Sequence, residues 1–245
     1  MFLRKEKKMD YLRSKQYDKE FVKENMMGPN SMIILENLLE DIPLTSNMRV
    51  LDLGCGNGLT SIFLAKEYDL QVFAVDLWIP ASENYKRFSK MNLEKQIIPI
   101  HADAAQLPFA DEYFDAVISV DAYHYFGSND SYFDLNLARV LKKDALIAIA
   151  VPGMKSEIHN HIPDEMKPYW SGEAVATWNT CEWWRKTFLK SDKIKIKNIR
   201  EMDCFKEAWE DWLKTENSYA MADKLMLEKD NGRYMNLISI TGNRR

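Results

Sequence analysis

Residues 50–58 have the sequence VLDLGCGNG, and this segment decides the fold. A short apolar run ends with Asp52 and Leu53, glycines then occupy every second position from Gly54, and the spacing predicts a helix after Gly58. Glycine lets the backbone turn tightly and lets a ligand lie against it, because no Cβ intervenes. The segment therefore predicts a strand, a ligand-binding turn and a helix.

A dinucleotide-binding turn is the first alternative for this segment. Its Gly-x-Gly-x-x-Gly spacing requires glycine at position 59, which is Leu59 in this sequence. A Tyr-x-x-x-Lys pair is also missing after the fourth predicted strand. A nicotinamide oxidoreductase is therefore the poorer fit.

Strand and helix patterns alternate around the glycine segment. Strands are predicted at 48–53, 70–75, 97–100, 114–120 and 145–151, and helices at about 58–67, 81–92 and 130–142. A helix near 179–190, a strand near 192–203, a helix near 206–229 and a strand near 233–241 follow. This alternation predicts an α/β, Rossmann-like fold with a predominantly parallel seven-stranded sheet and helices on both faces.

Composition and charge exclude several classes of protein. The 245 residues include 33 basic and 37 acidic side chains, so the net charge of −4 gives no reason to expect a nucleic-acid partner. Three cysteines (Cys55, Cys181 and Cys204) are too few for a disulfide framework or a zinc site. Neither a membrane span nor a secretory signal is evident. We therefore expect a cytoplasmic protein without a membrane or nucleic-acid partner, and without a bound metal.

Acidic residues also follow the next two predicted strands. Asp76 is placed where a carboxylate can bind the two hydroxyls of a ribose, since it accepts two short hydrogen bonds. Asp103, after the third strand, can accept from an adenine amino group. Together with Asp52, these acids favour a nucleoside ligand and leave little room for phosphates.

With these residues in place, the sequence resembles the class I S-adenosylmethionine-dependent methyltransferases that act on small molecules. The matching segments are VLDLGCGNGLTSIFLA at 50–65, VFAVDL at 72–77, HADAAQLPFADEYFDAVISVDAYHYF at 101–126 and LKKDALIAIAVPG at 141–153. One departure is visible, because Lys143-Asp144-Ala145 stands where the family usually has a Gly-Gly turn before its fifth strand.

The resemblance implies a cofactor, S-adenosyl-L-methionine, with S-adenosyl-L-homocysteine as its product. It also implies the residues that bind them, which are Asp52, Gly54, Cys55, Gly56, Asp76, Leu77, Asp103, Ala104 and Val120. Within this set, Gly54 and Gly56 would pass under the methionine part and Asp52 would lie near its amino group. Asp76 would bind the ribose, and Val120 would close the sulfonium end.

The methyl acceptor is expected beyond the fourth strand, beside the aromatic residues of loop 121–126. Tyr123 and Tyr125 are predicted to contact it. His124 is the candidate base, because an imidazole can take a proton near neutral pH, although it can equally cap the strand end. Tyr17 is a second candidate, by a loose resemblance in layout to phosphoethanolamine methyltransferases, and packing is its alternative role.

The organisation implied is one domain over residues 1–245. Residues 1–45 form an N-terminal helical cover, 46–151 the cofactor-binding core, 152–178 a substrate lid and 179–245 the completion of the sheet. Trp170 and Trp178 are the aromatic residues predicted to contact substrate from the lid. The leading function is methyl transfer from S-adenosylmethionine to a small-molecule acceptor. A non-catalytic cofactor-binding module and a protein-directed methyltransferase are the alternatives.

Overall fold

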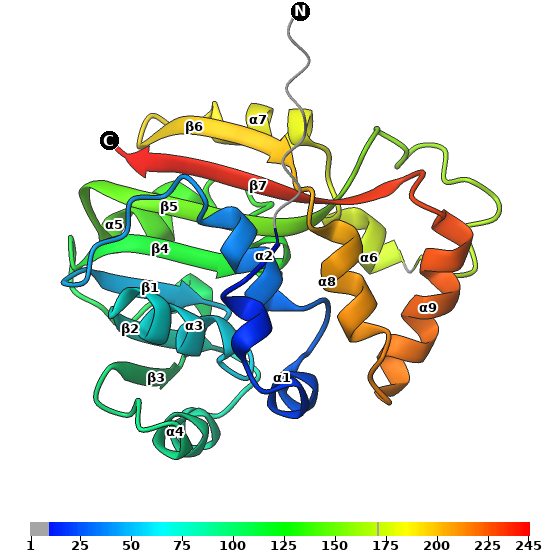
Figure 1. The fold of residues 1–245 in the computed structure, drawn as a ribbon. Helices are drawn as coiled ribbons and strands as arrows, with labels where there is room; N and C mark the ends of the chain where they lie inside the picture. Colours follow the sequence, from blue (N-terminus) through cyan, green and yellow to red (C-terminus); the bar gives the residue numbers. More distant parts are fainter. Residues whose placement is uncertain (1–9, 171) are drawn as a thin grey trace, which may run out of the picture.

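The computed structural model describes residues 10–170 and 172–245. Its centre is one seven-stranded sheet with the strand order β3-β2-β1-β4-β5-β7-β6 (Figure 1). The strands are β1 (Arg49–Leu53), β2 (Gln71–Asp76), β3 (Ile97–His101), β4 (Phe114–Val120), β5 (Leu141–Met154), β6 (Ile194–Glu201) and β7 (Met235–Arg244). Strands β1 to β5 pair in parallel, and β7 runs antiparallel to both β5 and β6. The predicted Rossmann-like sheet is therefore confirmed.

Helices cover both faces of the sheet (Figure 1). The α-helices are α1 (Lys19–Asn25), α2 (Ser31–Leu38), α3 (Leu59–Tyr68), α4 (Ala81–Lys90), α5 (Ala138–Val140), α6 (Gly172–Thr177), α7 (Cys181–Phe188), α8 (Phe205–Trp212) and α9 (Ser218–Asp230). Four short helical turns are η1 (Ser14–Gln16), η2 (Ala104–Gln106), η3 (Tyr123–Tyr125) and the π-helical η4 (Phe133–Leu137).

Alternate residues of the central strands supply two hydrophobic cores. In β1, Val50 belongs to the core under α2, α3 and α8, whereas Leu51 and Leu53 belong to the core under η4, α5 and α7. Successive strand residues point to opposite faces, so a strand buried on both sides must be apolar throughout. This requirement explains why the middle residues of β1, β2 and β4 are mostly apolar.

One predicted element differs in the structure. The single helix predicted at 206–229 is wrong, because α8 ends at Trp212 and the Asn217 side chain accepts from Tyr219 N–H to start α9. The helix predicted at about 130–142 is present over 132–140, with the π-helical η4 in its middle and α5 at its end, and β5 begins directly after it at Leu141. Residues 1–9 of the predicted N-terminal helices lie outside the described residues.

The turn before the buried part of β5 lacks the family's glycines, and Asp144 takes their conformational role. Its φ of 63° lies in the left-handed region, which aspartate tolerates better than most residues. Its carbonyl accepts from Asn243 Nδ2 at 2.8 Å, which ties this turn to β7. The departure in sequence is therefore confined to the surface of the sheet.

The N-terminal segment is anchored to α8. Asn30 caps the start of α2, with its side chain accepting from Met32 and Ile33 N–H. Its backbone N–H donates to Ala208 O at 2.9 Å, and its amide donates to Asp211 Oδ2 at 3.0 Å. These contacts hold residues 26–30 against the edge of the sheet where β1, β2 and β4 end.

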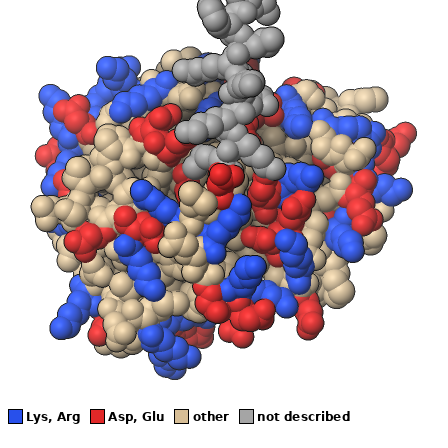
Figure 2. All heavy atoms as spheres, viewed as in Figure 1, with Lys and Arg blue, Asp and Glu red and all other residues tan. Residues whose placement is uncertain are grey.

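The surface offers no large area of one charge on the face seen in Figure 1. Figure 2 shows lysine and arginine intermixed there with aspartate and glutamate. Within residues 10–170 and 172–245, no helix has the length and apolar character needed to cross a membrane.

The buried indole of Trp184 joins α7 to the loop after β4, and we expect it to be a major contributor to stability. Its ring lies 5.9 Å from Tyr123 and 6.0 Å from Phe188 between centroids. Trp184→Ala should lower the free energy of unfolding by about 3–5 kcal/mol, because it removes a large side chain from a closed core. Urea titration followed by circular dichroism measures this. The neighbouring, partly exposed Trp183→Ala is the control, and equal losses in both variants would contradict the assignment.

Candidate functional site

A cavity of about 190 Å³ opens where β1, β2 and β4 end. Five segments supply most of its lining: the glycine turn at 54–57, residues 76–78 at the end of β2, residues 102–104 after β3, residues 120–122 and 125–126 around the end of β4, and part of the N-terminal loop between Asn25 and Ser31. The strand order reverses between β1 and β4, and open α/β sheets bind ligands at such a point. The cavity therefore lies where the fold favours a ligand.

The floor of the cavity requires glycine at two positions. Gly54 and Gly56 have φ of 78° and 53°. A Cβ on Gly54 would lie 2.2 Å from the Cβ of Ala122, and one on Gly56 would lie 3.0 Å from Met27 Sδ. The backbone of the turn is therefore closely packed against Ala122 and Met27, and only glycine allows this approach at the two positions.

Asp76 is fixed in the cavity wall by backbone donors. Its Oδ2 accepts from Gly56 N–H at 2.8 Å, and its Oδ1 accepts from Trp78 and Ile79 N–H at 2.7 and 2.9 Å. An ionised carboxylate has about four acceptor positions, so it can still accept from a ligand hydroxyl. The same contacts orient the turn and the wall together.

All the predicted cofactor residues except Asp52 line the cavity: Gly54, Cys55, Gly56, Asp76, Leu77, Asp103, Ala104 and Val120. Asp103 uses one carboxylate oxygen to accept from Ala105 N–H at 2.8 Å. Their assignment to parts of the cofactor stays a prediction. Their convergence on one wall is what a nucleoside ligand needs.

Asp52 lies behind the wall instead. Its Oδ2 accepts from the hydroxyls of Thr60 and Ser61 at 2.6 and 2.5 Å, and so it fixes the start of α3. Burial raises the pKa of Asp52 to about 6, although the two hydroxyls oppose that shift. Its Oδ1 is buried and has no partner among the described residues. Of the acids predicted to meet the cofactor, Asp52 is thus the one set back from the cavity.

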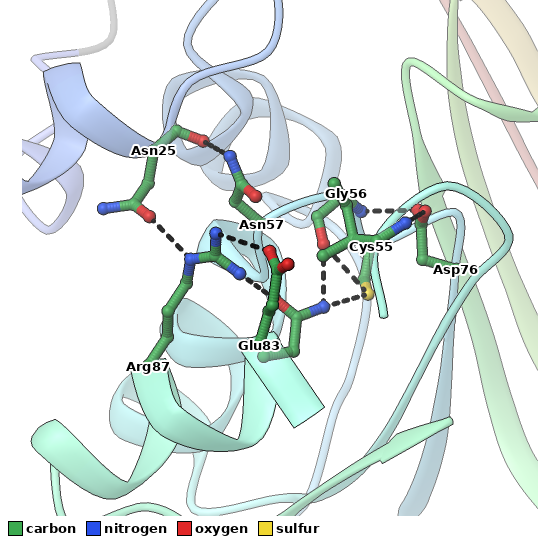
Figure 3. A network of polar contacts seen from close by, with 9 residues as sticks. Asn25, Cys55, Gly56, Asn57, Asp76, Glu83 and Arg87 are labelled. Atoms are coloured by element: carbon green, nitrogen blue, oxygen red, sulfur yellow. Dashed lines mark hydrogen bonds and ion pairs between the residues drawn. The ribbon is translucent and has the colours of Figure 1, made fainter. Parts of the chain in front are cut away.

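A polar network connects the glycine turn to the N-terminal cover (Figure 3). Arg87 of α4 donates to Asn25 Oδ1 and to Asn84 Oδ1, both at 3.0 Å. Asn84 in turn donates to Gly56 O at 2.9 Å, and Asn57 donates to Asn25 O at 3.3 Å. The end of α1 is therefore held directly against the cavity floor.

Of the residues predicted to take part in catalysis or to contact the substrate, some line the cavity and others do not. Tyr125 lines the cavity, where its ring contacts Trp78 edge to face at 5.3 Å. Tyr123 is fully buried in the opposite core and does not line the cavity, so its contact with an acceptor stays a prediction that this position does not favour. The short turn η3 sends these two tyrosines to different sides.

His124 also lies outside the cavity lining. Its side chain is buried, Nδ1 has no partner among the described residues, and burial lowers the pKa of the imidazole to about 3. A neutral imidazole with so low a pKa is a weak proton acceptor at neutral pH. Its role as a base stays a prediction that this environment does not favour.

Three further predicted residues lie away from the cavity. The Tyr17 hydroxyl donates to Glu67 Oε1 at 3.0 Å, and its ring packs on Phe63. Trp170 is buried against Tyr234, and Trp178 packs on the main core. None of these lines the cavity, so their predicted contacts with the acceptor stay predictions.

Asp121 is a cavity residue that the sequence reasoning missed. It follows β4 directly, has a φ of 55°, and donates its N–H to Ala150 O at 2.8 Å. Burial, and secondarily the charge of Asp223, raise the pKa of its carboxyl to about 7. The sequence does contain an indication of this residue, because Asp121 is the fourth acidic residue at the end of a predicted strand, after Asp52, Asp76 and Asp103.

The described residues include no group of three or more side chains suited to hold a metal ion. His159, the first histidine of the His159-x-His161 pair, contacts Glu157 and the carbonyl of Val175 instead.

Comparison with known proteins finds similarity to methyltransferases. A family model described as a methyltransferase domain matches residues 51–149. The 27-O-demethylrifamycin SV methyltransferase of Amycolatopsis mediterranei is 28% identical over 117 residues, which are 47% of this chain and 43% of that protein. The malonyl-[acyl-carrier protein] O-methyltransferase of Geobacter sulfurreducens is 32% identical over 108 residues, 43% of this chain and 39% of that protein.

The structural likeness covers more of the chain. Phosphoethanolamine N-methyltransferase 2 of Haemonchus contortus, solved with S-adenosyl-L-methionine, superposes with a TM-score of 0.72 at 22% identity. The match covers 96% of this chain and 59% of that one, and at this identity it shows the fold alone. The chain spans less than half the length of the two curated relatives. The family match runs from within β1 to within β5 and contains the whole glycine turn and both acidic strand ends beside it, so this part of the chain is similar to the class I S-adenosylmethionine-dependent methyltransferases.

Proposed function

We propose that this chain is an enzyme that transfers a methyl group from S-adenosyl-L-methionine to a small-molecule acceptor. The observation that carries the proposal is the cavity at the β1/β4 reversal, with its glycine floor and the Asp76 wall. The similarity to a methyltransferase named for demethylrifamycin supports a small-molecule acceptor. We also propose that the chain forms one domain, with the N-terminal segment as its cover.

The residues present fit the cofactor. Gly54 and Gly56 line the cavity where its methionine part would lie, and Asp76 keeps an acceptor position for a ribose hydroxyl. Leu77, which follows Asp76, and Ala104, which follows Asp103, also line the cavity. Both offer apolar contact to the adenine. When bound, the cofactor supplies an electrophilic methyl group on a sulfonium.

The contribution of the chain is to position the acceptor and to exclude water. In-line displacement requires the attacking atom about 3–3.5 Å from the methyl carbon, so positioning is the largest effect available. We place the acceptor beyond β4, beside Asp121 and Tyr125 and below Met27 and Gly28. This arrangement makes the N-terminal loop the cover of the reaction space.

The aromatic lid predicted at 152–178 stays a prediction. Trp170 and Trp178 do not line the cavity, so the support for a lid comes from its position in the chain alone. A lid function would require this segment to add to the cover that Met27 and Gly28 already provide.

Asp76→Ala should weaken binding of S-adenosylhomocysteine about tenfold to a hundredfold. A hydrogen bond to a charged group contributes about 1.5–3 kcal/mol, and tenfold in affinity corresponds to about 1.4 kcal/mol. Isothermal titration calorimetry with S-adenosylmethionine, S-adenosylhomocysteine and NADH measures it. Asp164→Ala, at an exposed position, is the control. Binding of NADH alone would overturn the proposal, and adenosyl binding without turnover of any acceptor would indicate a binding module.

Gly54→Ala should abolish detectable cofactor binding, because the new Cβ would displace Ala122 and deform the floor. The matched control is Gly232→Ala, since Gly232 has a φ of 71° but open space around its Cβ position. Both variants place alanine in the left-handed region at a cost of about 1–2 kcal/mol, so both should unfold at lower temperature. Only Gly54→Ala should lose the heat of S-adenosylhomocysteine binding. Normal binding by both would show that the floor is not needed.

A further inference from the structure

The cavity has an excess of negative charge. Its lining includes the carboxylates of Asp76, Asp103 and Asp121, and no lysine, arginine or histidine among the described residues. An anionic acceptor would enter this space without a cation to pair with it. A phosphate-bearing or carboxylate-bearing acceptor is therefore the least suited to it.

The three carboxylates differ in how much of their charge is already satisfied. Asp76 accepts from three backbone N–H groups, and Asp103 accepts from one. The Asp121 carboxylate receives neither a hydrogen bond nor an ion pair from the part of the chain that the structure describes, although it is half-buried. Buried charges are normally paired, so Asp121 is the group whose charge is left for a ligand.

The position of Asp121 is fixed by the backbone and by its neighbours. Its N–H bond to Ala150 O and its left-handed φ turn the chain at the end of β4. Its Oδ2 lies only 2.8 Å from the place that a Cβ of Gly28 would occupy. The absence of a side chain at Gly28 therefore makes room for this carboxylate beneath the N-terminal loop.

The charge of a second carboxylate, that of Asp223, acts on Asp121. Asp223 of α9 accepts from Trp212 Nε1 at 2.8 Å, and burial raises its pKa. Its charge adds to the effect of burial on Asp121, whose pKa rises to about 7. A cation beside Asp121 would stabilise its charged form by both Coulomb attraction and a hydrogen bond, whereas a neutral donor would supply the hydrogen bond alone.

We propose that the acceptor is a cationic amine and that Asp121 binds its nitrogen; this inference rests on the proposed function. Asp121 accepts one proton from the ammonium group, which frees the nitrogen lone pair. That lone pair forms the new N–C bond while the C–S bond breaks and its electrons stay on sulfur as a thioether. The methylated ammonium product carries the positive charge, and the Asp121 proton passes to solvent.

The competing explanation is that Asp121 contacts the positively charged sulfonium of the cofactor. The two explanations differ in what Asp121→Asn changes. If Asp121 contacts only the acceptor, the substitution leaves the affinities for S-adenosylmethionine and S-adenosylhomocysteine both unchanged. Loss of a contact with the sulfonium weakens S-adenosylmethionine alone. Asparagine tolerates the left-handed region, so the variant should keep the turn.

The experiment uses calorimetry on the full chain. The protein is first saturated with S-adenosylhomocysteine and then titrated with benzylamine and ethanolamine, each beside its neutral match, benzyl alcohol and ethylene glycol. We expect at least one amine to bind and its alcohol to bind at least tenfold more weakly. Asp121→Asn should weaken the amine at least tenfold and change S-adenosylhomocysteine affinity less than twofold. The exposed Asp164→Asn should change neither.

Four outcomes would overturn the inference. Binding of neither amine to the saturated protein would do so, as would equal binding of an amine and its alcohol. Undiminished amine binding by Asp121→Asn would exclude its role, and selective loss of S-adenosylmethionine would assign Asp121 to the cofactor. Failure of the unaltered chain to bind S-adenosylhomocysteine is a separate result, which overturns the proposed function itself.

Discussion

The hydrogen bond from Gly56 N–H to the Asp76 carboxylate joins the turn after β1 to the end of β2, and the site depends on it. The turn is also held by Gly54 and Cys55 N–H, which both donate to Val75 O. Because β1 and β2 are neighbours in a parallel sheet, their carboxyl ends meet at one edge, and these bonds hold the glycine backbone there. A glycine turn with a free carboxylate would be mobile, whereas this one is fixed before any ligand arrives, which reduces the ordering cost of binding.

The cover over the cavity is built outward from that turn. Asn57 and Arg87 hold Asn25, which places Met27 over Gly56, and Asn30 fastens the other end of the loop to α8. The loop is therefore secured at both ends by polar contacts and contributes only small or flexible groups to the cavity. Because the anchoring contacts lie at the two ends of the loop, its middle can be well positioned and still leave space for an acceptor.

Much of this arrangement was predictable because it is local in sequence. Gly54 and Gly56 lie in the turn that follows β1, and Asp76 ends β2, so strand order alone brings them together. Tyr123 and Tyr125 show the limit of such reasoning, since a single helical turn decides that Tyr123 meets the core and Tyr125 the cavity. The contact between Tyr17 and Glu67 was not predictable either, because the two residues lie 50 positions apart and no sequence pattern indicates it.

The proton chemistry of the site is the property that sequence alone could not give. Burial disfavours the charged form of any group, so it lowers the pKa of His124 to about 3 and raises that of Asp121 to about 7. The imidazole that residue type favoured thereby becomes a poor base, and a carboxyl that is ordinarily too acidic acquires a pKa close to neutral. A base works best when its pKa lies near the working pH, so the environment favours Asp121 over His124 as the proton acceptor that we propose. The same residue then carries the uncompensated charge and the ability to take a proton, which are the two properties that an ammonium acceptor requires of the chain.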